Sequence, residues 1–111
     1  MVVRLQDDEL NQLFRALGDT TRRDILRRTL LSEESVSGLA EDYAMSFAAV
    51  QKHVAVLERA GLVEKTSRGR ERIVRASPDR LSRARDCLKA LEELWCHRLR
   101  ALDDLLTPSE R

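Results

Sequence analysis

The sequence is poor in aromatic residues, glycine, proline and cysteine. Phe, Trp and Tyr together make up 4% of the 111 residues, and there are only four glycines, two prolines and two cysteines. A core with so few aromatic side chains has to be small and aliphatic, and a chain of this length fits one domain, 1–111. No internal repeat or low-complexity tract is present.

A long apolar run is also missing. No stretch approaches the roughly 20 apolar residues of a membrane-spanning helix, and the first ten residues lack the apolar centre of a signal peptide. We therefore expect a cytoplasmic protein without a membrane partner. Cys87 and Cys96 lie in one predicted helix, about 13 Å apart along its axis, which is too far for a disulfide within one chain. Reduced thiols are expected.

Charge is nearly balanced overall but unevenly placed. Twenty basic and 19 acidic side chains leave a formal charge of +1, which argues against a protein that coats nucleic acid indiscriminately. Residues 44–75 hold seven basic and three acidic side chains, so this segment alone carries +4. Any contact with nucleic acid is expected there.

The first part of the chain predicts three helices. An apolar stripe at helical spacing predicts a first helix that ends before Gly18. Asp19 is a good N-cap for a second helix over 20–31. A loop over 32–35 then leads to a short third helix over 35–44, which begins a helix-turn-helix.

A helix, a hairpin and a basic tip follow. Ser46 opens a helix with a polar, cationic face, and Gly61 stops it. Two short β-prone runs, 62–65 and 72–75, flank a loop in which Gly69 can take the positive φ of a tight hairpin. These elements predict a recognition helix followed by a wing, with the boundaries helix-turn-helix about 35–60 and wing about 62–76.

The last predicted helix, about 78–106, carries a long apolar seam. Ser77, Pro78 and Asp79 make a strong helix start, and apolar residues then recur at steps of three or four over more than three heptads. A terminal seam of this length needs a partner, and the first helix has a matching stripe.

The predicted fold is mainly α with a small β-hairpin, a winged helix-turn-helix in the order α-α-α-α-β-β-α. We expect it to form a symmetric homodimer through the first and last helices, with the interface residues Leu10, Leu13, Phe14, Leu17, Leu88, Leu91, Trp95, Leu99 and Leu102.

The N-terminal part of a recognition helix meets base edges in proteins of this type. Gln can pair with adenine and Lys with guanine, and arginines on a wing can contact phosphates or enter a narrow minor groove. The alternative is an ordinary solvated face. The candidate DNA-contacting residues are Ser46, Phe47, Ala48, Gln51, Lys52 and His53 on the helix, and Arg68, Arg70 and Arg72 on the wing.

His53 has three interpretations: a phosphate contact, a hydrogen bond at the edge of the core, and metal ligation. We favour the phosphate contact, since no Cys or His lies three or four residues away to share a metal. Arg22 and Arg23 could pair with acids such as Glu41 or Asp42, or brace phosphates, and we favour the structural role.

Two segments resemble the ArsR family of bacterial winged-helix repressors. They read LFRALGDTTRRDIL and MSFAAVQKHVAVLERAGLVEKTSRGRERIVR, and a Trp-containing last helix follows them. The most specific parts are LGDTTRRDIL and the run from Ser46 to Val63, which ends in the pattern VLxxAGLV. The resemblance implies a homodimer that binds an operator near its own promoter, which we expect to be an inverted repeat of double-stranded DNA, and represses transcription, often until a ligand releases it.

The family's metal motifs are not matched. Metal-sensing members resemble one another through paired cysteines on the third helix, where residues 36–40 offer no soft-metal ligand here. Members with a last-helix site carry an Asp followed two residues on by His, but here Asp86 is followed by Leu88, and later positions such as Leu99 are apolar. The resemblance is therefore to the non-metal branch: no metal or cofactor is expected, and the inducer is unknown.

Other functions remain as alternatives. Cys87, Cys96 and His97 could form a thiol- or metal-responsive site across the dimer, although the two cysteines fall about 180° apart around the helix. The winged helix could instead be a protein-interaction module, which an eroded wing would favour, but the wing keeps its arginines. An enzyme is not expected, because no Ser/His/Asp set, Gly-rich phosphate loop or paired carboxylates in a cleft is evident.

Overall fold

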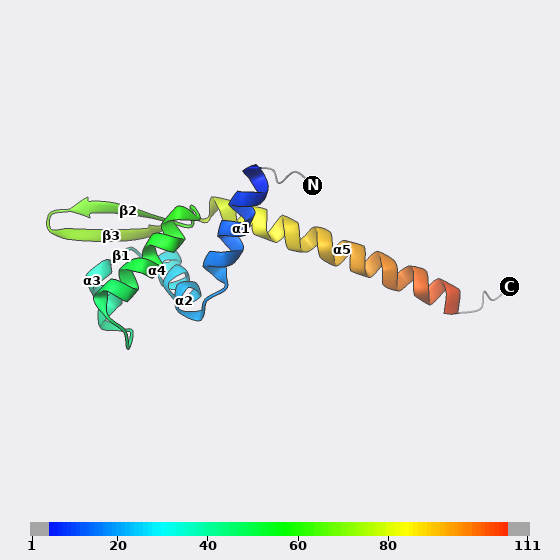
Figure 1. Cartoon of the computed structure of the whole chain (residues 1–111), viewed down its shortest axis with the longest axis horizontal. Coiled ribbons are helices and arrows are strands. Elements are labelled where there is room, and N and C mark those ends of the chain that lie inside the picture. Colours follow the sequence, from blue (N-terminus) through cyan, green and yellow to red (C-terminus); the bar gives the residue numbers. More distant parts are fainter. Residues whose placement is uncertain (1–4, 107–111) are drawn as a thin grey trace.

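The computed structural model describes residues 5–106, with side chains from Asp7 onward. It confirms the predicted fold class: a mainly helical winged helix-turn-helix with a small antiparallel hairpin and a long C-terminal helix (Figure 1). The elements in chain order are α1 (Leu5–Leu17), α2 (Thr20–Leu31), β1 (Glu34–Ser35), α3 (Val36–Glu41), α4 (Phe47–Arg59), β2 (Val63–Arg68), β3 (Glu71–Ala76), the 3-10 helix η1 (Pro78–Arg80) and α5 (Leu81–Leu106).

Side-chain caps fix where two of the helices begin. The Asp19 carboxylate accepts a hydrogen bond from the backbone N–H of Arg22 at the start of α2, and Ser46 Oγ accepts one from the N–H of Ala49 at the start of α4. Both predicted caps are confirmed. The predicted cap at Ser77 is wrong, because its side chain makes no capping bond and a 3-10 turn precedes α5.

The sheet is larger than the sequence predicted. Its order is β1-β3-β2 with both pairs antiparallel, and residues 34–35, predicted as loop, pair with Val74 and Ile73 on the other edge of β3. The hairpin is also longer than the runs 62–65 and 72–75, since its ladder continues to the pair Arg68 and Glu71. Only two residues remain for the turn, where Gly69 has a φ of 66°.

The core is aliphatic, as the scarcity of aromatic residues predicted. Side chains from α1 to β3 meet in one cluster, and its largest fully buried members are Leu13, Ile25, Leu39, Leu57, Leu62, Val50, Val54 and Val74. Leu13 requires a correction: it was predicted at the dimer interface, but none of its surface is exposed. Its side chain is already used to pack α1 onto the rest of its own chain.

A half-buried arginine joins α2 to the strands and to the turn before α4. Arg28 pairs with Glu34 at 2.5 Å and with Asp42 at 2.7 Å, and its guanidinium lies 5.5 Å from the centre of the Tyr43 ring. The Tyr43 hydroxyl donates to the Asp24 carboxylate at 2.6 Å. This network spans both ends of α3, so it holds the first helix of the helix-turn-helix in place.

The ionisation of Tyr43 is expected to report on this network. Burial, aided by the hydrogen bond to Asp24, raises the pKa of Tyr43 to about 12, against about 10 in an unfolded chain. Because the folded-state pKa is the higher one, the stability that this group contributes is complete below pH 10 and is lost as the pH rises through about 12. Tyr43 is the only tyrosine, so absorbance at 295 nm follows it alone. A midpoint near 10 in the folded protein, or no difference from Tyr43→Phe in alkaline unfolding, would contradict this expectation.

Candidate nucleic-acid interface

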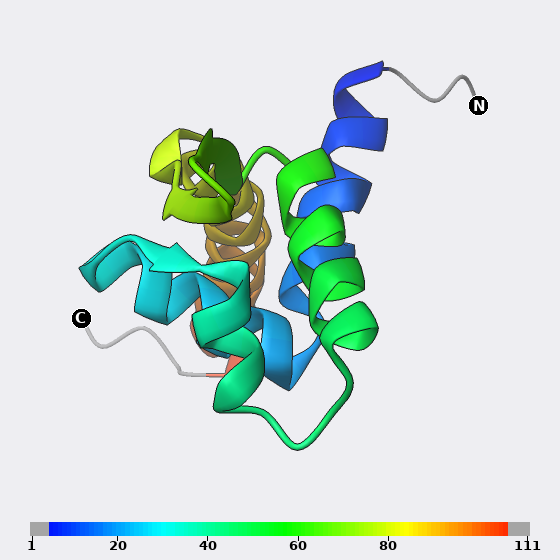
Figure 2. The same ribbon diagram turned by 90° about the vertical axis from the view of Figure 1, so that its left-hand side faces the viewer.

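The two faces of α4 differ sharply. Val50, Val54 and Leu57 are completely buried in the core, whereas Gln51 and Lys52 are exposed. In the described part of the chain neither exposed side chain has a hydrogen bond or an ion pair. In Figure 2, α4 lies in front of α1 and is joined to α3 by the loop at the bottom of the view. Its polar face is therefore free to meet a partner.

The other candidates at the start of α4 have mixed surroundings. Phe47 is 48% exposed, and Ala48 beside it is also exposed. Ser46 Oγ already accepts the capping bond from Ala49 at 3.1 Å, but its O–H remains a donor. All three side chains lie within the first turn of the helix or just before it.

His53 lies at the edge of the core. Its side chain is only 21% exposed, and its Nδ1 lies 3.2 Å from Nη1 of Arg22 and 3.8 Å from the Asp19 carboxylate. This is hydrogen bonding at the edge of the core, the second of the three interpretations. The contact uses only Nδ1, so a phosphate contact through Nε2 stays a prediction.

Arg22 and Arg23 are structural, although not through the acids that were expected. Arg22 donates to the backbone carbonyl oxygens of Ala16 at 2.9 Å and Arg15 at 2.8 Å, and Arg23 donates to that of Leu17 at 2.6 Å. These carbonyls belong to the last turn of α1 and lack partners within that helix. The hydrogen bond from Arg22 N–H lowers the pKa of Asp19, and the positive charge of Arg22 acts in the same direction, against partial burial, which raises it.

The wing extends away from the helices (Figure 1). Arg68 lies 3.5 Å from Glu33, but both side chains are largely exposed and such pairs contribute little. Arg70 occupies the turn beside Gly69, and Arg72 lies opposite Ser67 in the ladder. All three predicted arginines are exposed on the hairpin.

One further basic residue joins the candidate surface. Arg59 is exposed near the end of α4 and lies seven residues after Lys52, so the two share a face of the helix. Other bases in the segment are paired: Lys65 lies 3.5 Å from Glu58, and Arg75 lies 3.1 Å from Glu64. The seven-residue spacing was the sequence signal that could have added Arg59.

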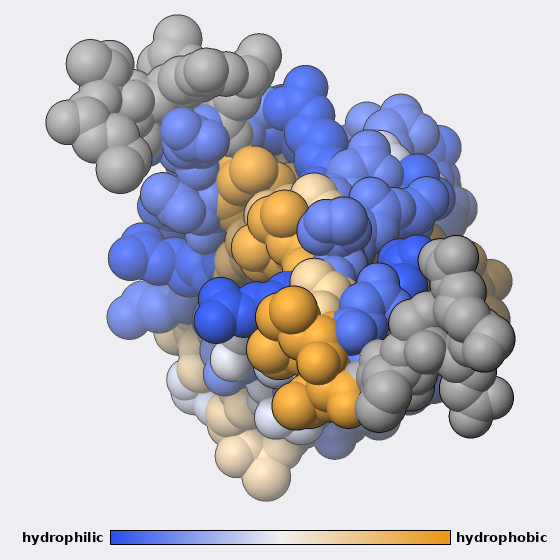
Figure 3. All heavy atoms as spheres, turned by 90° about the vertical axis from the view of Figure 1, so that its right-hand side faces the viewer, coloured by the Kyte–Doolittle hydropathy of each residue, from blue (hydrophilic) through white to orange (hydrophobic). Residues whose placement is uncertain are grey.

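A second exposed surface runs along α5, and it is apolar. Figure 3 shows hydrophobic side chains gathered in a band between hydrophilic ones, viewed from the α5 end of the molecule. The predicted seam residues are between 44% and 59% exposed, and large apolar residues that were not predicted lie near them. The first group is Leu88, Leu91, Trp95, Leu99 and Leu102, and the second is Leu94 and Leu105. Leu106, the last residue of the predicted apolar spacing, is 80% exposed.

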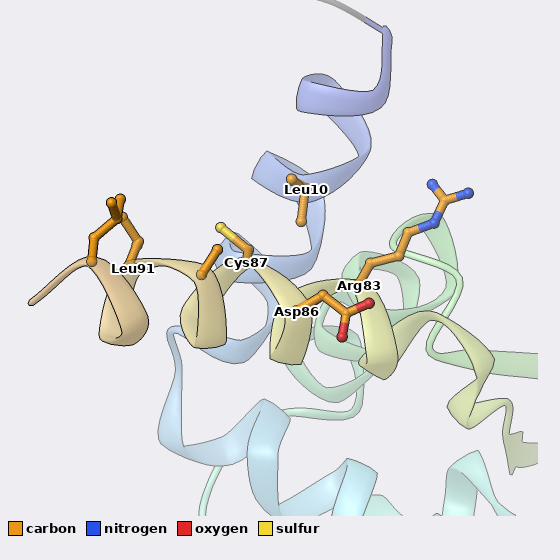
Figure 4. A pocket seen from close by; sticks show the side chains of 7 residues that line it. Leu10, Arg83, Asp86, Cys87 and Leu91 are labelled. Carbon is orange, nitrogen blue, oxygen red and sulfur yellow. The ribbon is translucent and has the colours of Figure 1, made fainter. Parts of the chain in front are cut away.

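The first helix contributes less to this surface than predicted. Leu10 and Leu17 are half-buried and pack against the core of their own chain, and Phe14 is also half-buried. Where α1 crosses α5, Leu10 faces a groove of about 570 Å³. Figure 4 shows Cys87 and Leu91 on the α5 side of this groove, with Arg83 and Asp86 at its other end.

The cysteines do not gather with other ligands. Cys87 is half-buried beside α1, whereas Cys96 is exposed further along α5. Within residues 5–106, no three His, Cys, Asp or Glu side chains are grouped so that they could hold a metal ion. None of the helices in the same range is long and apolar enough to span a membrane.

A buried core built from four helices and the sheet, an exposed recognition helix and a basic hairpin together define a winged helix-turn-helix DNA-binding protein. Residues 19–65 match the model of the family described as "Bacterial regulatory protein, arsR family". The HTH-type transcriptional regulator Rv2034 of Mycobacterium tuberculosis is 31% identical over 96 residues, which cover 86% of this chain and 87% of that protein.

Solved structures agree. The ArsR-like transcriptional regulator from Rhodococcus sp. RHA1 superposes with a TM-score of 0.76 at 33% identity, covering 92% of this chain and 96% of that one. The homodimeric winged helix-turn-helix domain of Mb0332 from Mycobacterium bovis, a possible ArsR-family regulator, shares the fold at 20% identity and a TM-score of 0.62, covering 82% and 84%. The chain belongs to the ArsR family and is a DNA-binding transcriptional regulator, in a family that is not enzymatic.

Proposed function

We propose that the protein is a homodimeric, sequence-specific repressor that binds an inverted-repeat operator near its own promoter. The observation that carries this function is the pairing of two free surfaces on one chain, the polar face of α4 and the apolar face of α5. The polar face of α4 can hydrogen-bond to base edges, and the apolar face of α5 can pack against α5 of a second copy. The whole chain acts as one domain in the cytoplasm.

The exposed apolar band of α5 supports a dimer. Its exposed leucines and Trp95 continue at helical spacing far beyond the end of its contact with α1 (Figure 1). A band of this kind is costly to leave in water, and a two-fold axis covers it with an identical band. A dimer with two recognition helices places them about 34 Å apart, one turn of DNA, on the two half-sites of an inverted repeat.

Assignment to the non-metal branch rests on residue types. Val36, Ser37, Gly38, Leu39 and Ala40 take up the place of the family's third-helix cysteines, and none of them is a soft-metal ligand. Control of this repressor is therefore proposed to come from an organic inducer or from its own level of expression.

Fluorescence anisotropy tests the function directly. The purified protein is titrated against its own upstream DNA and a scrambled duplex, at two salt concentrations, with and without Zn(II) or the oxidant diamide. We expect tight binding to the upstream DNA alone, weaker at the higher salt because phosphate contacts release counterions, and indifferent to metal and oxidant.

Two results would contradict this. Equal, weak binding to both duplexes would favour a protein-interaction module. Release of the operator by Zn(II) or diamide would favour a sensor built on Cys87, Cys96 and His97.

A further inference from the structure

Arg22 joins three helices through one side chain. Its Nε and Nη2 donate to the carbonyl oxygens of Ala16 and Arg15 in the last turn of α1, at 2.9 and 2.8 Å. Its remaining nitrogen, Nη1, lies 3.2 Å from Nδ1 of His53 on α4. All three nitrogens of the guanidinium are therefore engaged, and the side chain starts from α2. Arg22 is a bridge between the end of α1 and the recognition helix.

The geometry of this bridge is directional. A guanidinium is planar, and its donors leave it at fixed angles, so two anchored nitrogens determine where the third one points. Arginine is always a donor, so Nδ1 of His53 is the acceptor, and in the neutral ring the proton lies on Nε2. The side chain of Asp19 is fixed beside them by its own capping bond to the N–H of Arg22.

The position of His53 makes this contact relevant to DNA reading. His53 directly follows Lys52 and lies two residues after Gln51. Each residue of a helix turns it by about 100°, so fixing the direction of His53 also fixes where these two side chains point. Recognition requires such groups to be held within about 10–20° of the productive orientation.

We propose that Arg22 is a positioning residue that sets the rotation of the recognition helix against α1 through His53. Packing of Val50, Val54 and Leu57 attaches α4 to the core, and the bridge then fixes its orientation about its own axis. This role rests on the proposed reading of bases by α4. Helix α1 also borders the proposed dimer surface. Arg22 therefore connects α1, beside the proposed two-fold axis, to α4, which is proposed to contact the DNA.

The chain contains a matched control for this test. Arg23 is the next residue, and it donates to the carbonyl of Leu17 in the same turn of α1 but makes no bond to α4. Arg22→Lys and Arg23→Lys both keep the charge and the helix propensity while removing the planar fork. For each variant, affinity for the operator and for a scrambled duplex is measured beside the sedimentation behaviour and the thermal midpoint.

We expect Arg22→Lys to lower the ratio of operator to scrambled affinity by about tenfold or more, which is what the loss of a bidentate contact to one base costs. Arg23→Lys should leave the ratio unchanged. His53→Ala should act like Arg22→Lys, and the double variant should be no worse than either single one, because the two residues form one contact. His53→Gln should restore part of the ratio, since its side-chain oxygen can accept from Arg22.

The histidine rings give a readout that general loss of stability does not imitate. Nitrogen-15 spectra should show the Nε2–H tautomer for neutral His53 with an Nδ1 chemical shift typical of a nitrogen that accepts a hydrogen bond, and Arg22→Lys should move that Nδ1 shift towards the value of an unbonded nitrogen. His97, the other of the two histidines, lies on α5 and should not change.

The bridge is refuted if Arg22→Lys and Arg23→Lys have equal effects on the ratio, or if both lower only the thermal midpoint. If Arg22→Lys does not fold, His53→Ala decides alone, and an unchanged ratio in that variant overturns the role. A wild-type protein that does not discriminate the operator would instead contradict the proposed function.

Discussion

Replacing Trp95 with alanine is expected to weaken the association of two chains by several kcal/mol. Trp95 is 58% exposed in the single chain and lies among leucines on the apolar band of α5. Truncating a tryptophan that becomes buried costs about 3–5 kcal/mol, and a symmetric dimer contains two copies of it. Because the dimer is the proposed DNA-binding form, operator affinity at low protein concentration should fall with it.

Sedimentation equilibrium measures the dimer constant directly. Trp95 is the only tryptophan, so dilution of the wild-type protein should also shift its emission towards longer wavelengths as the dimer dissociates. Leu31→Ala is a suitable control, because Leu31 is a large apolar residue that is 77% exposed but lies at the end of α2 and not on the band of α5. An unchanged association state in Trp95→Ala would refute the α5 interface.

Features set by local chemistry could be predicted from the sequence. Asp19 and Ser46 each cap a helix through their own side chains, and the glycines at 61 and 69 both adopt a positive φ. Such signals involve residues within four positions of one another, so they can be recognised without knowledge of the tertiary structure. Apolar spacing likewise identified the buried face of α4 and the exposed face of α5.

Features that depend on distant neighbours could not be predicted. The strand at residues 34–35 is too short to have a pattern of its own and forms because β3 offers it a free edge. Leu13 and Leu10 belong to the same apolar stripe in the sequence. In the structure Leu13 is buried in the core, whereas Leu10 lines the groove where α5 crosses α1. The contact of His53 with Arg22 spans 31 positions of the chain, so no local pattern indicates it.

Replacing Gln51 and Lys52 together with alanine should abolish discrimination between the operator and a scrambled duplex. Both side chains are exposed on the N-terminal half of α4, outside the stripe that packs it onto the core. A good bidentate contact to a base is worth about 1–3 kcal/mol of discrimination, so losing two of them in each half-site removes most of a specific affinity. The thermal midpoint and the dimer constant should stay the same, because neither residue is buried.

The wing provides the contrast that makes this result interpretable. Arg70→Ala removes an exposed cation from the turn of the hairpin, where a phosphate contact is proposed. Its affinity should fall about equally for both duplexes, and its salt dependence should decrease by about one counterion for each half-site, about two for the dimer, with the ratio preserved. Competition titrations of both variants at two salt concentrations separate the two behaviours. If specific binding persists in the double α4 variant, the face of α4 that meets the bases is a different one, and the exposed pair Phe47 and Ala48 at its start would be the next to replace.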